Sequence, residues 1–195
     1  MSHFFAILAR MKFIRRWGLM HNTVEETIQD HTLQTAMIAY HLAVLHNKRS
    51  GEPIDAGKAA VLAMFHDASE VYTGDMPTPV KYFSPNMRAT YGEVEKLAQE
   101  RIVHSLPADL QEAYRPILME AESSREWPYV KAADTISAYL KCLVEKNFGN
   151  REFDAAYETI EEKLKSSALP EVQEFLNEYA QSFLLTIDEI NKQTD

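Results

Sequence analysis

Hydrophobic side chains recur every three to four positions along nearly the whole chain, and no segment alternates convincingly between apolar and polar residues. The first spacing places apolar side chains along one face of a helix, whereas a half-buried strand needs alternation. The pattern therefore predicts an all-α fold, a compact helical bundle with no sheet. About eight helices are expected, over residues 4–15, 28–46, 56–71, 86–105, 107–122, 128–147, 152–166 and 170–191.

The same spacing identifies the apolar faces of the first three helices. The first helix carries Phe4, Ile7, Leu8 and Met11 on one side. The apolar positions that follow the helical spacing in the second helix are Leu33, Met37, Tyr40 and Val44. In the third helix the residues expected to enter the core are Val61, Leu62, Met64 and Phe65.

Polar residues and prolines mark where several helices begin. Thr27 precedes the second helix, and Asp30 three residues later completes a capping box. Asp55 is placed to cap the third helix, and Pro128 suits the first turn of the sixth. The segment 74–79 contains a glycine and two prolines, which predicts an ordered turn that no helix crosses.

The length and composition fit one folded unit. A chain of 195 residues can bury roughly 70 % of its unfolded surface. Hydrophobic residues make up 46 % and charged residues 25 %, which is ordinary for a globular protein. A short loop is expected at residues 51–53, and no repeat or long linker divides the chain. We therefore expect a single domain over residues 1–195, with disorder only in the last few residues.

The charge balance excludes one class of partner. The formal net charge is −9, and no basic stripe is visible that could neutralise the phosphates of a nucleic-acid polymer. A small anionic substrate is compatible with this charge, because a metal ion and two or three cations can offset the overall field locally.

Cysteine usage and hydropathy bear on the compartment. Cys142 is the only cysteine and lies in an apolar stretch, so we expect a buried, inert thiol and no internal disulfide. No apolar run approaches the ~20 residues that span a membrane. Arg10 and Lys12 interrupt the N-terminal segment, which lacks a small-residue cleavage site. A cytoplasmic protein without membrane association is the expectation.

Two histidines and two aspartates form the candidate chemistry. His66 and Asp67 are adjacent in the run MFHDASEV, with His31 upstream and Asp134 downstream. Imidazole and carboxylate ligands suit a divalent ion such as Mn, Co, Fe or Zn. Glu70 follows Asp67 by three residues, so the helical spacing places it on the same side as the pair. The remaining histidines show no second ligand set, which predicts one ion.

Each of these residues alone has an ordinary structural explanation. An adjacent His-Asp pair often occurs by chance, and His31 could be a capping or core histidine. Asp134 is less easily explained, because an acid in the middle of a buried helix needs a partner. The combination on three helices that can converge favours the metal site.

The cations and other polar residues are individually ambiguous. Arg16 and Lys81 are the obvious cations for a phosphate, yet spacing alone does not distinguish Arg16 from Arg15. Trp17 could belong to the core, and Asp75 could simply stabilise its turn.

The order of His31, His66-Asp67 and Asp134 resembles that of the HD-domain metal-dependent phosphohydrolases. More specifically, the strings SHFFAILARM, IRRWGLM, HDASEVYTGDMPTPVKYF and VKAADTISAYLKCL resemble the YfbR-type bacterial 5′-deoxynucleotidases. The resemblance covers essentially the whole chain and rests mainly on the long GDMPTPVKYF block. It implies an all-α fold, one divalent ion such as Co or Mn, and a homodimer. It also implies hydrolysis of deoxyribonucleoside 5′-monophosphates with little base preference.

The resemblance also assigns roles to individual residues. It implies catalysis by Glu70 and Asp67, and an indole of Trp17 that crowds the 2′ position of the sugar. The implied metal ligands are His31, His66, Asp67 and Asp134. The implied substrate contacts are Arg16, Trp17, His31, Asp75, Thr78, Pro79, Val80, Lys81 and Asp134.

Two departures from the family pattern concern substrate affinity rather than metal ligation. Gln29-Asp30 stands before His31 where the family commonly has Ser-Glu or Ala-Glu, and residues 22–26 lack an expected basic side chain. Two other functions stay open at this point. One is an HD phosphohydrolase that acts on a triphosphate or a guanosine tetraphosphate, and the other is a non-catalytic helical module with a structural metal. The apolar positions of the last two helices are a candidate dimer surface.

Overall fold

The structure is a computed structural model that describes residues 1–49, 52–81 and 83–193. The first residue of the loop expected at 51–53 lies outside these ranges, as do the last two residues, which belong to the end where disorder is expected. The all-α prediction is confirmed, because the described residues contain no strand beyond an isolated bridge between Arg15 and Thr27. The α-helices are α1 (Phe4–Leu8), α2 (Ile28–Arg49), α3 (Ala56–Phe65), α4 (Glu70–Thr73), α5 (Thr78–Lys81), α6 (Pro85–His104), α7 (Ala108–Leu118), α8 (Trp127–Asn147), α9 (Asp154–Lys165), α10 (Pro170–Tyr179) and α11 (Ile187–Gln193).

The signals for helix starts predicted from the sequence are confirmed. The Thr27 N–H donates to Asp30 Oδ2 at 3.0 Å, and the Asp30 N–H donates to Thr27 Oγ1 at 3.2 Å, which completes the capping box of α2. Asp55 Oδ1 accepts from the Lys58 N–H at 2.9 Å at the start of α3. Pro128 lies in the first turn of α8.

The continuous helix expected over residues 56–71 is wrong. Helix α3 ends at Phe65, and the chain turns through residues 66–69 before α4 begins at Glu70. In this turn the Ala68 N–H donates to the Phe65 carbonyl and the Glu70 N–H to the Asp67 carbonyl, each three residues back. These tighter turns redirect the polar residues that follow the apolar part of α3.

Three other expected helices are also interrupted. The one expected over residues 107–122 ends as α7 at Leu118, before the 3-10 helix η2 (Ala121–Ser123). The first expected helix continues from α1 as the 3-10 helix η1 (Ala9–Phe13). The last one changes into the 3-10 helix η4 (Ala180–Leu184) before α11. A second capping box explains this break, because the Thr186 N–H donates to Glu189 Oε2 at 2.8 Å and starts a new helix.

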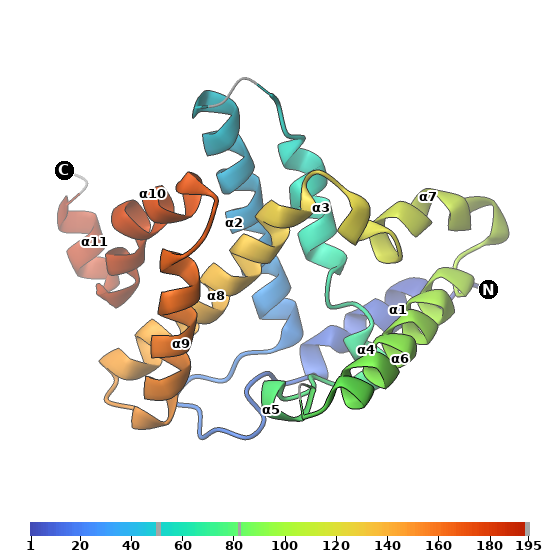
Figure 1. Ribbon diagram of the computed structural model, residues 1–195, viewed down its shortest axis with the longest axis horizontal. Coiled ribbons are helices and arrows are strands. Elements are labelled where there is room, and N and C mark those ends of the chain that lie inside the picture. Colours follow the sequence, from blue (N-terminus) through green and yellow to red (C-terminus); the bar gives the residue numbers. More distant parts are fainter. Residues whose placement is uncertain (50–51, 82, 194–195) are drawn as a thin grey trace.

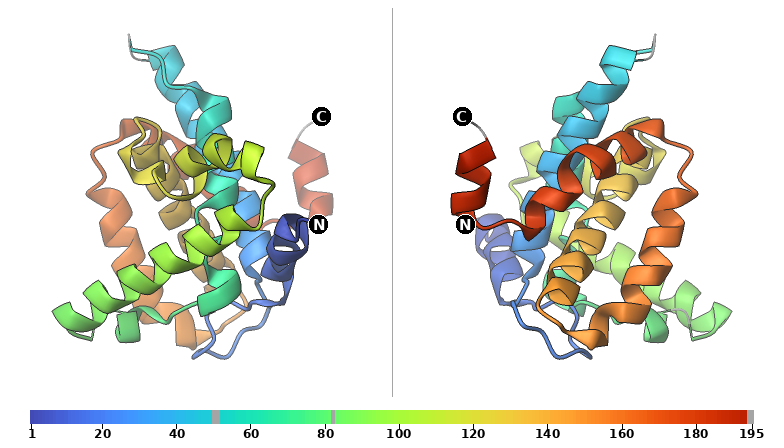
Figure 2. Two further views of the ribbon diagram at one scale, coloured as in Figure 1. Left: turned by 90° about the vertical axis from the view of Figure 1, so that its right-hand side faces the viewer. Right: turned by 90° about the vertical axis from the view of Figure 1, so that its left-hand side faces the viewer.

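The core consists of two clusters of buried side chains. The larger cluster lies where α2, α3, α8, α9 and α10 meet, and α2 crosses α8 near its centre (Figure 1). The smaller cluster includes Phe4 of α1, Ala68 of the turn after α3, and Ile102 and Val103 of α6. Figure 1 shows α6 beside α1 and α4, across the molecule from α9, and in Figure 2 the green α6 lies in front in the left view and behind in the right view. The turn after α3 therefore contributes Ala68 to the smaller cluster, while the single-domain organisation stays a prediction.

Several apolar side chains lie on the surface. Leu33, Met37 and Tyr40 of α2 are 56 %, 60 % and 50 % exposed, although they follow the helical spacing. Met64 was expected in the core, and this prediction is wrong because it is 46 % exposed. On α2 the buried face consists instead of small and aliphatic residues such as Ala39, Leu42 and Ala43.

Two further sequence predictions concern the single cysteine and the absence of membrane-spanning segments. Cys142 is fully buried, and burial raises the pKa of its thiol to about 12, as expected for an inert cysteine. In the described part of the chain, no helix combines the length and the apolar character needed to cross a bilayer.

Candidate metal and substrate site

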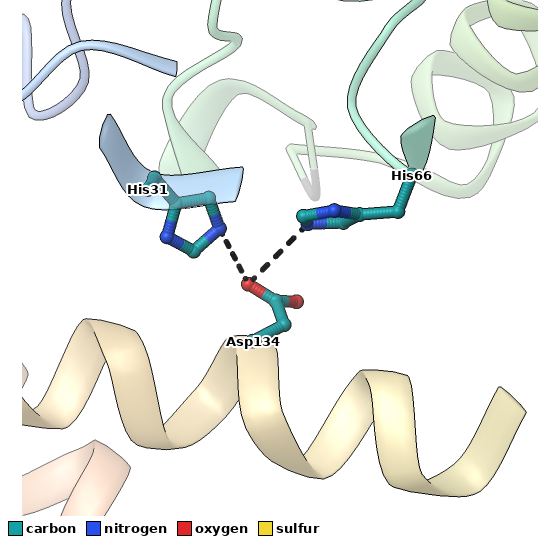
Figure 3. Close-up of side chains that lie close together, drawn as sticks. All are labelled: His31, His66 and Asp134. Carbon is teal, nitrogen blue, oxygen red and sulfur yellow. Dashed lines mark ion pairs between the residues drawn. The ribbon is translucent and has the colours of Figure 1, made fainter. Parts of the chain in front are cut away.

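Four side chains from three helical segments converge beside the larger core. His31 lies in the first turns of α2, His66 directly follows α3, and Asp134 lies in α8 (Figure 3). His31 Nε2 lies 3.2 Å from Asp134 Oδ1 and 3.6 Å from Asp67 Oδ2. His66 Nε2 lies 3.1 Å from Asp67 Oδ2 and 4.0 Å from Asp134 Oδ1. The structure therefore brings together the four residues that the sequence suggested as metal ligands. These residues, His31, His66, Asp67 and Asp134, are called the metal group.

Both histidines are held so that Nε2 faces this group. The His66 Nδ1–H donates to the Ala63 carbonyl at 2.7 Å. His31 Nδ1 lies 3.1 Å from Ser137 Oγ, whose own hydroxyl donates to Gln34 Oε1 at 2.7 Å. Ser137 can therefore accept the proton of His31 Nδ1. In this arrangement each Nε2 presents a lone pair to the carboxylates, as in histidines that bind metals.

The donor atoms fit a divalent ion. His31, His66 and Asp134 each offer a ligand atom within 4.8 Å of the others, and they are the one group of this kind among the described residues. Ligands at about 2.1 Å from an ion lie about 3 to 4 Å from one another, as these atoms do. Both Nε2 atoms are buried and make no hydrogen bond, although they lie beside carboxylates. A cation would supply the missing partner of both.

The carboxylates of the site are ready to act as ligands. Burial alone would raise the pKa of Asp67, but the neighbouring His66 lowers it to about 2. The pKa of Asp134 also lies well below its ordinary value, because His31 and Lys131 outweigh the effect of burial. Lys131 Nζ lies 2.7 Å from Asp134 Oδ2 and so holds the oxygen that points away from His31. Both aspartates are ionised at neutral pH.

Glu70 has the opposite electrostatic setting. Burial, together with the negative charges of Asp67 and Asp75, raises the pKa of Glu70 to about 10. Its Oε2 is buried and makes no hydrogen bond. A carboxyl group that keeps its proton at neutral pH beside ionised carboxylates is suited to donate that proton to a leaving group.

The structure distinguishes the two neighbouring arginines. Arg15 is exposed and pairs with exposed Glu25 at 2.6 Å. Arg16 is buried, which lowers its pKa, but Glu26, Asp67 and further carboxylates outweigh burial and raise it. Arg16 is therefore the arginine whose charge lies near the metal group.

Trp17 and Asp75 contact each other through the tryptophan backbone. The Trp17 N–H donates to Asp75 Oδ2 at 3.2 Å. The indole packs against Phe153 with a ring-centroid distance of 5.2 Å. Trp17 therefore lies between the turn after α4 and the 3-10 helix η3 (Arg151–Phe153) that follows α8, rather than in either core cluster.

The segment 78–81 forms the short helix α5 rather than a turn alone. Thr78, Pro79 and Val80 are exposed, whereas Lys81 is half-buried. Lys81 Nζ lies 3.0 Å from Glu95 Oε1 on α6 and 4.8 Å from the ring centroid of Tyr91. Its charge acts on Glu70, where it opposes the increase in pKa. The segment thus borders the group, and its substrate contacts stay a prediction.

Sequence reasoning missed the residues that support this site. Ser137 and Gln34 orient His31 through a chain of hydrogen bonds. Glu26 accepts from both Arg16 and Trp17, and Glu145 accepts from the backbone of residues 23 and 24. The one available signal was Glu145 itself, a charged residue in the apolar face of the helix that carries Asp134.

Comparisons with known proteins agree with this geometry. The chain matches the family described as 5′-deoxynucleotidase YfbR-like over residues 3–183. It is 46 % identical over 193 residues to a 5′-deoxynucleotidase of Shewanella oneidensis, with 98 % of this chain and 99 % of that protein covered. It is 45 % identical over 192 residues to the 5′-deoxynucleotidase YfbR of Escherichia coli O1:K1 / APEC, with 98 % and 96 % covered.

Among solved structures, an HD-domain phosphohydrolase from Listeria innocua has the same fold. The TM-score is 0.81 at 24 % identity, and the match covers 95 % of this chain and 90 % of that one. The chain therefore has the HD-domain fold and belongs to the YfbR-like 5′-deoxynucleotidase family.

Proposed function

We propose that this protein is a metal-dependent phosphomonoesterase that hydrolyses deoxyribonucleoside 5′-monophosphates to deoxynucleoside and phosphate. The observation that carries the proposal is the convergence of His31, His66, Asp67 and Asp134, near which burial raises the pKa of Glu70. Full-length similarity to 5′-deoxynucleotidases supports the substrate class. The two other functions considered from the sequence lack a comparable observation.

The four converging residues are the proposed ligands of one divalent ion. Two imidazoles and two carboxylates suit Co or Mn. When bound, such an ion lowers the pKa of a coordinated water and neutralises charge on phosphoryl oxygens. His31 and Asp134 are also proposed substrate contacts, and the charge of Arg16, the proposed phosphate ligand, acts on both of them.

The remaining chemistry belongs to the side chains around the group. Glu70 donates its proton to the 5′ oxygen as the phosphorus–oxygen bond breaks, and this proton neutralises the developing alkoxide. Asp67 keeps its charge at neutral pH and orients the attacking water. Arg16 binds phosphoryl oxygens through its guanidinium, and Lys81 adds a second positive charge from α5.

Sugar selectivity is assigned to Trp17 and Asp75. In this proposal the indole of Trp17 crowds a 2′ hydroxyl, which excludes ribonucleotides by steric clash. The carboxylate of Asp75 accepts from the 3′ hydroxyl in this proposal. Thr78, Pro79 and Val80 are the proposed wall of the substrate site, and their exposure leaves room for different bases.

A homodimer is the proposed assembly. Leu33, Met37 and Tyr40 lie four and three residues apart on α2 and form one exposed apolar stripe. The last expected helix, whose apolar positions were a candidate dimer surface, contributes Ile187 and Ile190 of α11, which are exposed at 69 % and 37 %. The proposed compartment is the cytoplasm, because the single thiol of Cys142 suits a reducing environment.

A substrate panel tests the proposed function. The four deoxyribonucleoside monophosphates, the matching ribonucleotides, a deoxynucleoside triphosphate and guanosine tetraphosphate are assayed with added Co or Mn, and with a chelator. We expect metal-dependent release of phosphate from the deoxyribonucleotides, little dependence on the base, and much slower turnover of ribonucleotides. Equal turnover of both sugars would contradict the role of Trp17. A preference for the longer phosphate chains would replace the proposed substrate.

A further inference from the structure

Glu26 joins the two side chains that the proposed function places beside the phosphate and the sugar. Its Oε2 lies 2.8 Å from Arg16 Nη1 and 2.9 Å from Trp17 Nε1. The Glu26 carbonyl also accepts from the Arg16 N–H at 2.9 Å. The side chains of Arg16 and Glu26 are only 14 % and 12 % exposed, so this contact is largely shielded from water. One carboxylate oxygen thus sets where the guanidinium and the indole lie relative to each other.

The backbone of Trp17 needs support from its surroundings. Its φ is +61°, and it is the only non-glycine residue with a positive φ in the described ranges. Such a conformation is unfavourable for a bulky side chain and persists where neighbouring contacts fix it. The Trp17 N–H donates to Asp75, and its carbonyl accepts from the Met20 N–H at 2.9 Å. These contacts fix the backbone, but only Glu26 holds the polar edge of the indole.

Glu26 itself lies in the segment from residue 14 to residue 28, which is fixed at its base and at its tip. At the base, the Ile28 N–H donates to the Ile14 carbonyl at 2.9 Å, beside the bridge between residues 15 and 27. At the tip, Glu145 of α8 accepts from the Thr23 and Val24 N–H groups at 3.0 Å each. Because α8 also carries Asp134, the segment and the metal group share one rigid support.

A charged acceptor at this position has a second consequence for Arg16. Asp67, Asp75 and Asp134 also attract its guanidinium. Without the charge of Glu26, these carboxylates alone would attract the guanidinium, and its position would depend on them. Glu26 has the largest effect of the charges that act on Arg16, so it contributes most to fixing the guanidinium.

We infer that Glu26 is a positioning residue that sets sugar selectivity and phosphate affinity, because it fixes Trp17 and Arg16 through a single carboxylate. The inference rests on the proposed function for its enzymatic consequences. The geometric part, that Glu26 fixes the indole of Trp17, can be measured without any substrate.

The test compares Glu26→Gln with Glu25→Gln. The neighbouring Glu25 is a matched control, because it pairs with Arg15 on the exposed side of the same segment. For Glu26→Gln we expect the KM for deoxyribonucleotides to rise about tenfold, as for the loss of one charge-assisted hydrogen bond, with a much smaller change in kcat. The ratio of kcat/KM for deoxyribonucleotides over ribonucleotides should fall, while Glu25→Gln keeps the wild-type values.

Fluorescence gives a readout that needs no catalysis. The chain contains two tryptophans, so Trp127→Phe leaves Trp17 as the sole indole. In this background Glu26→Gln should increase the quenching of Trp17 by acrylamide, whereas Glu25→Gln should not. If Glu26→Gln does not fold, Glu26→Asp replaces it, because the shorter side chain keeps the charge but cannot reach both donors.

Unchanged KM, sugar ratio and quenching in a folded Glu26 variant would overturn the inference. Equal losses in the Glu25 variant would also overturn it, because they would indicate a general effect on the segment. If the wild type hydrolyses no phosphomonoester, the proposed function fails, and the quenching comparison still decides whether Glu26 fixes Trp17.

Discussion

At the scale of single residues, Glu70 and Asp67 show how position controls protonation. They lie three residues apart, yet the pKa of Asp67 falls to about 2 while that of Glu70 rises to about 10. Asp67 faces two imidazoles, whereas Glu70 is buried among carboxylates and has an unpartnered oxygen. Asp67 is therefore suited to bind a metal ion, whereas Glu70 is suited to donate a proton.

Replacing Glu70 by alanine should therefore affect turnover and leave metal binding intact. We expect kcat to fall by about 10²–10⁴-fold, the range for loss of a positioned general acid. Elemental analysis of the purified variant should still give one ion per chain. A variant that loses its metal would mean that Glu70 is a ligand and not the acid.

The pKa of Glu70 also predicts a dependence of stability on pH. Because its pKa in the folded state is raised above the unfolded value of 4.5, its favourable contribution is complete below pH 4.5. That contribution is lost as the pH rises through about 10. In metal-free protein, the stability of the wild type relative to Glu70→Gln should fall with pH by up to about 1.4 kcal/mol per unit. Urea unfolding of both proteins at pH 5, 7 and 9 measures this difference, and a constant difference would refute the assigned pKa.

The sequence could predict the site residues whose side chains can themselves bind a metal ion. His31, His66 and Asp134 are recognisable because imidazoles and an isolated acid in apolar helices need a partner. The support from Ser137 could not be predicted, because a serine in a helix carries no such signal. The choice of Arg16 over Arg15 depends on which side of the segment faces the metal group, and tertiary structure decides this.

At the scale of secondary-structure elements, periodicity predicts helices well and their interruptions poorly. Capping by Thr27 and Asp55 is confirmed, because a cap depends on residues within one turn. The break after Phe65 has no glycine or proline, and it depends on tertiary contacts of the residues that follow. The break before α11 had a local signal in Thr186 and Glu189, which resembles the box at α2.

The attachment of residues 17–26 to α8 depends on a buried ion pair within that helix. Glu145 is fully buried and accepts from Lys141 and from Asn150 Nδ2. Burial opposes its ionisation, but Lys141 and the other donors lower the pKa of Glu145 to about 2. Its stabilisation is thus present above the unfolded pKa of 4.5 and is lost as the pH falls toward 2.

Glu145→Ala should lower the free energy of unfolding by about 3 kcal/mol at pH 7, because the buried charge of Lys141 loses its carboxylate and keeps only the Val24 carbonyl as a partner. The control is Lys165→Ala, which removes an exposed pair of the same spacing and should change the stability by less than about 0.5 kcal/mol. Urea unfolding of the two variants measures both effects. Equal effects would show that burial of the Glu145 pair is unimportant.

At the scale of the whole molecule, the exposed stripe on α2 and the metal group lie on the same helix. Leu33 follows His31 by two residues, so the stripe begins beside the site and points away from it. Periodicity identified these apolar positions but could not say whether they face the core or the surface. Their exposed fractions in the structure show that they lie on the surface.

Met37→Glu should therefore weaken the proposed homodimer. A charge at the centre of an apolar interface lacks a partner and disfavours association. Sedimentation analysis should show the wild type as a dimer and Met37→Glu as a monomer at the same concentration. Leu97→Glu on α6 is the matched control, because Leu97 is 65 % exposed and lies outside the stripe. A wild-type monomer, or a dimer in Met37→Glu, would contradict this surface.

The most direct test of the account is a metal titration of chelator-treated protein, followed by the release of phosphate from a deoxyribonucleoside monophosphate. We expect no activity without metal and a linear rise with added Co or Mn that ends at one equivalent per chain. His66→Ala should abolish this rise. Full activity of the metal-free protein, or an end point at two equivalents per chain, would contradict a single catalytic ion held by these four residues.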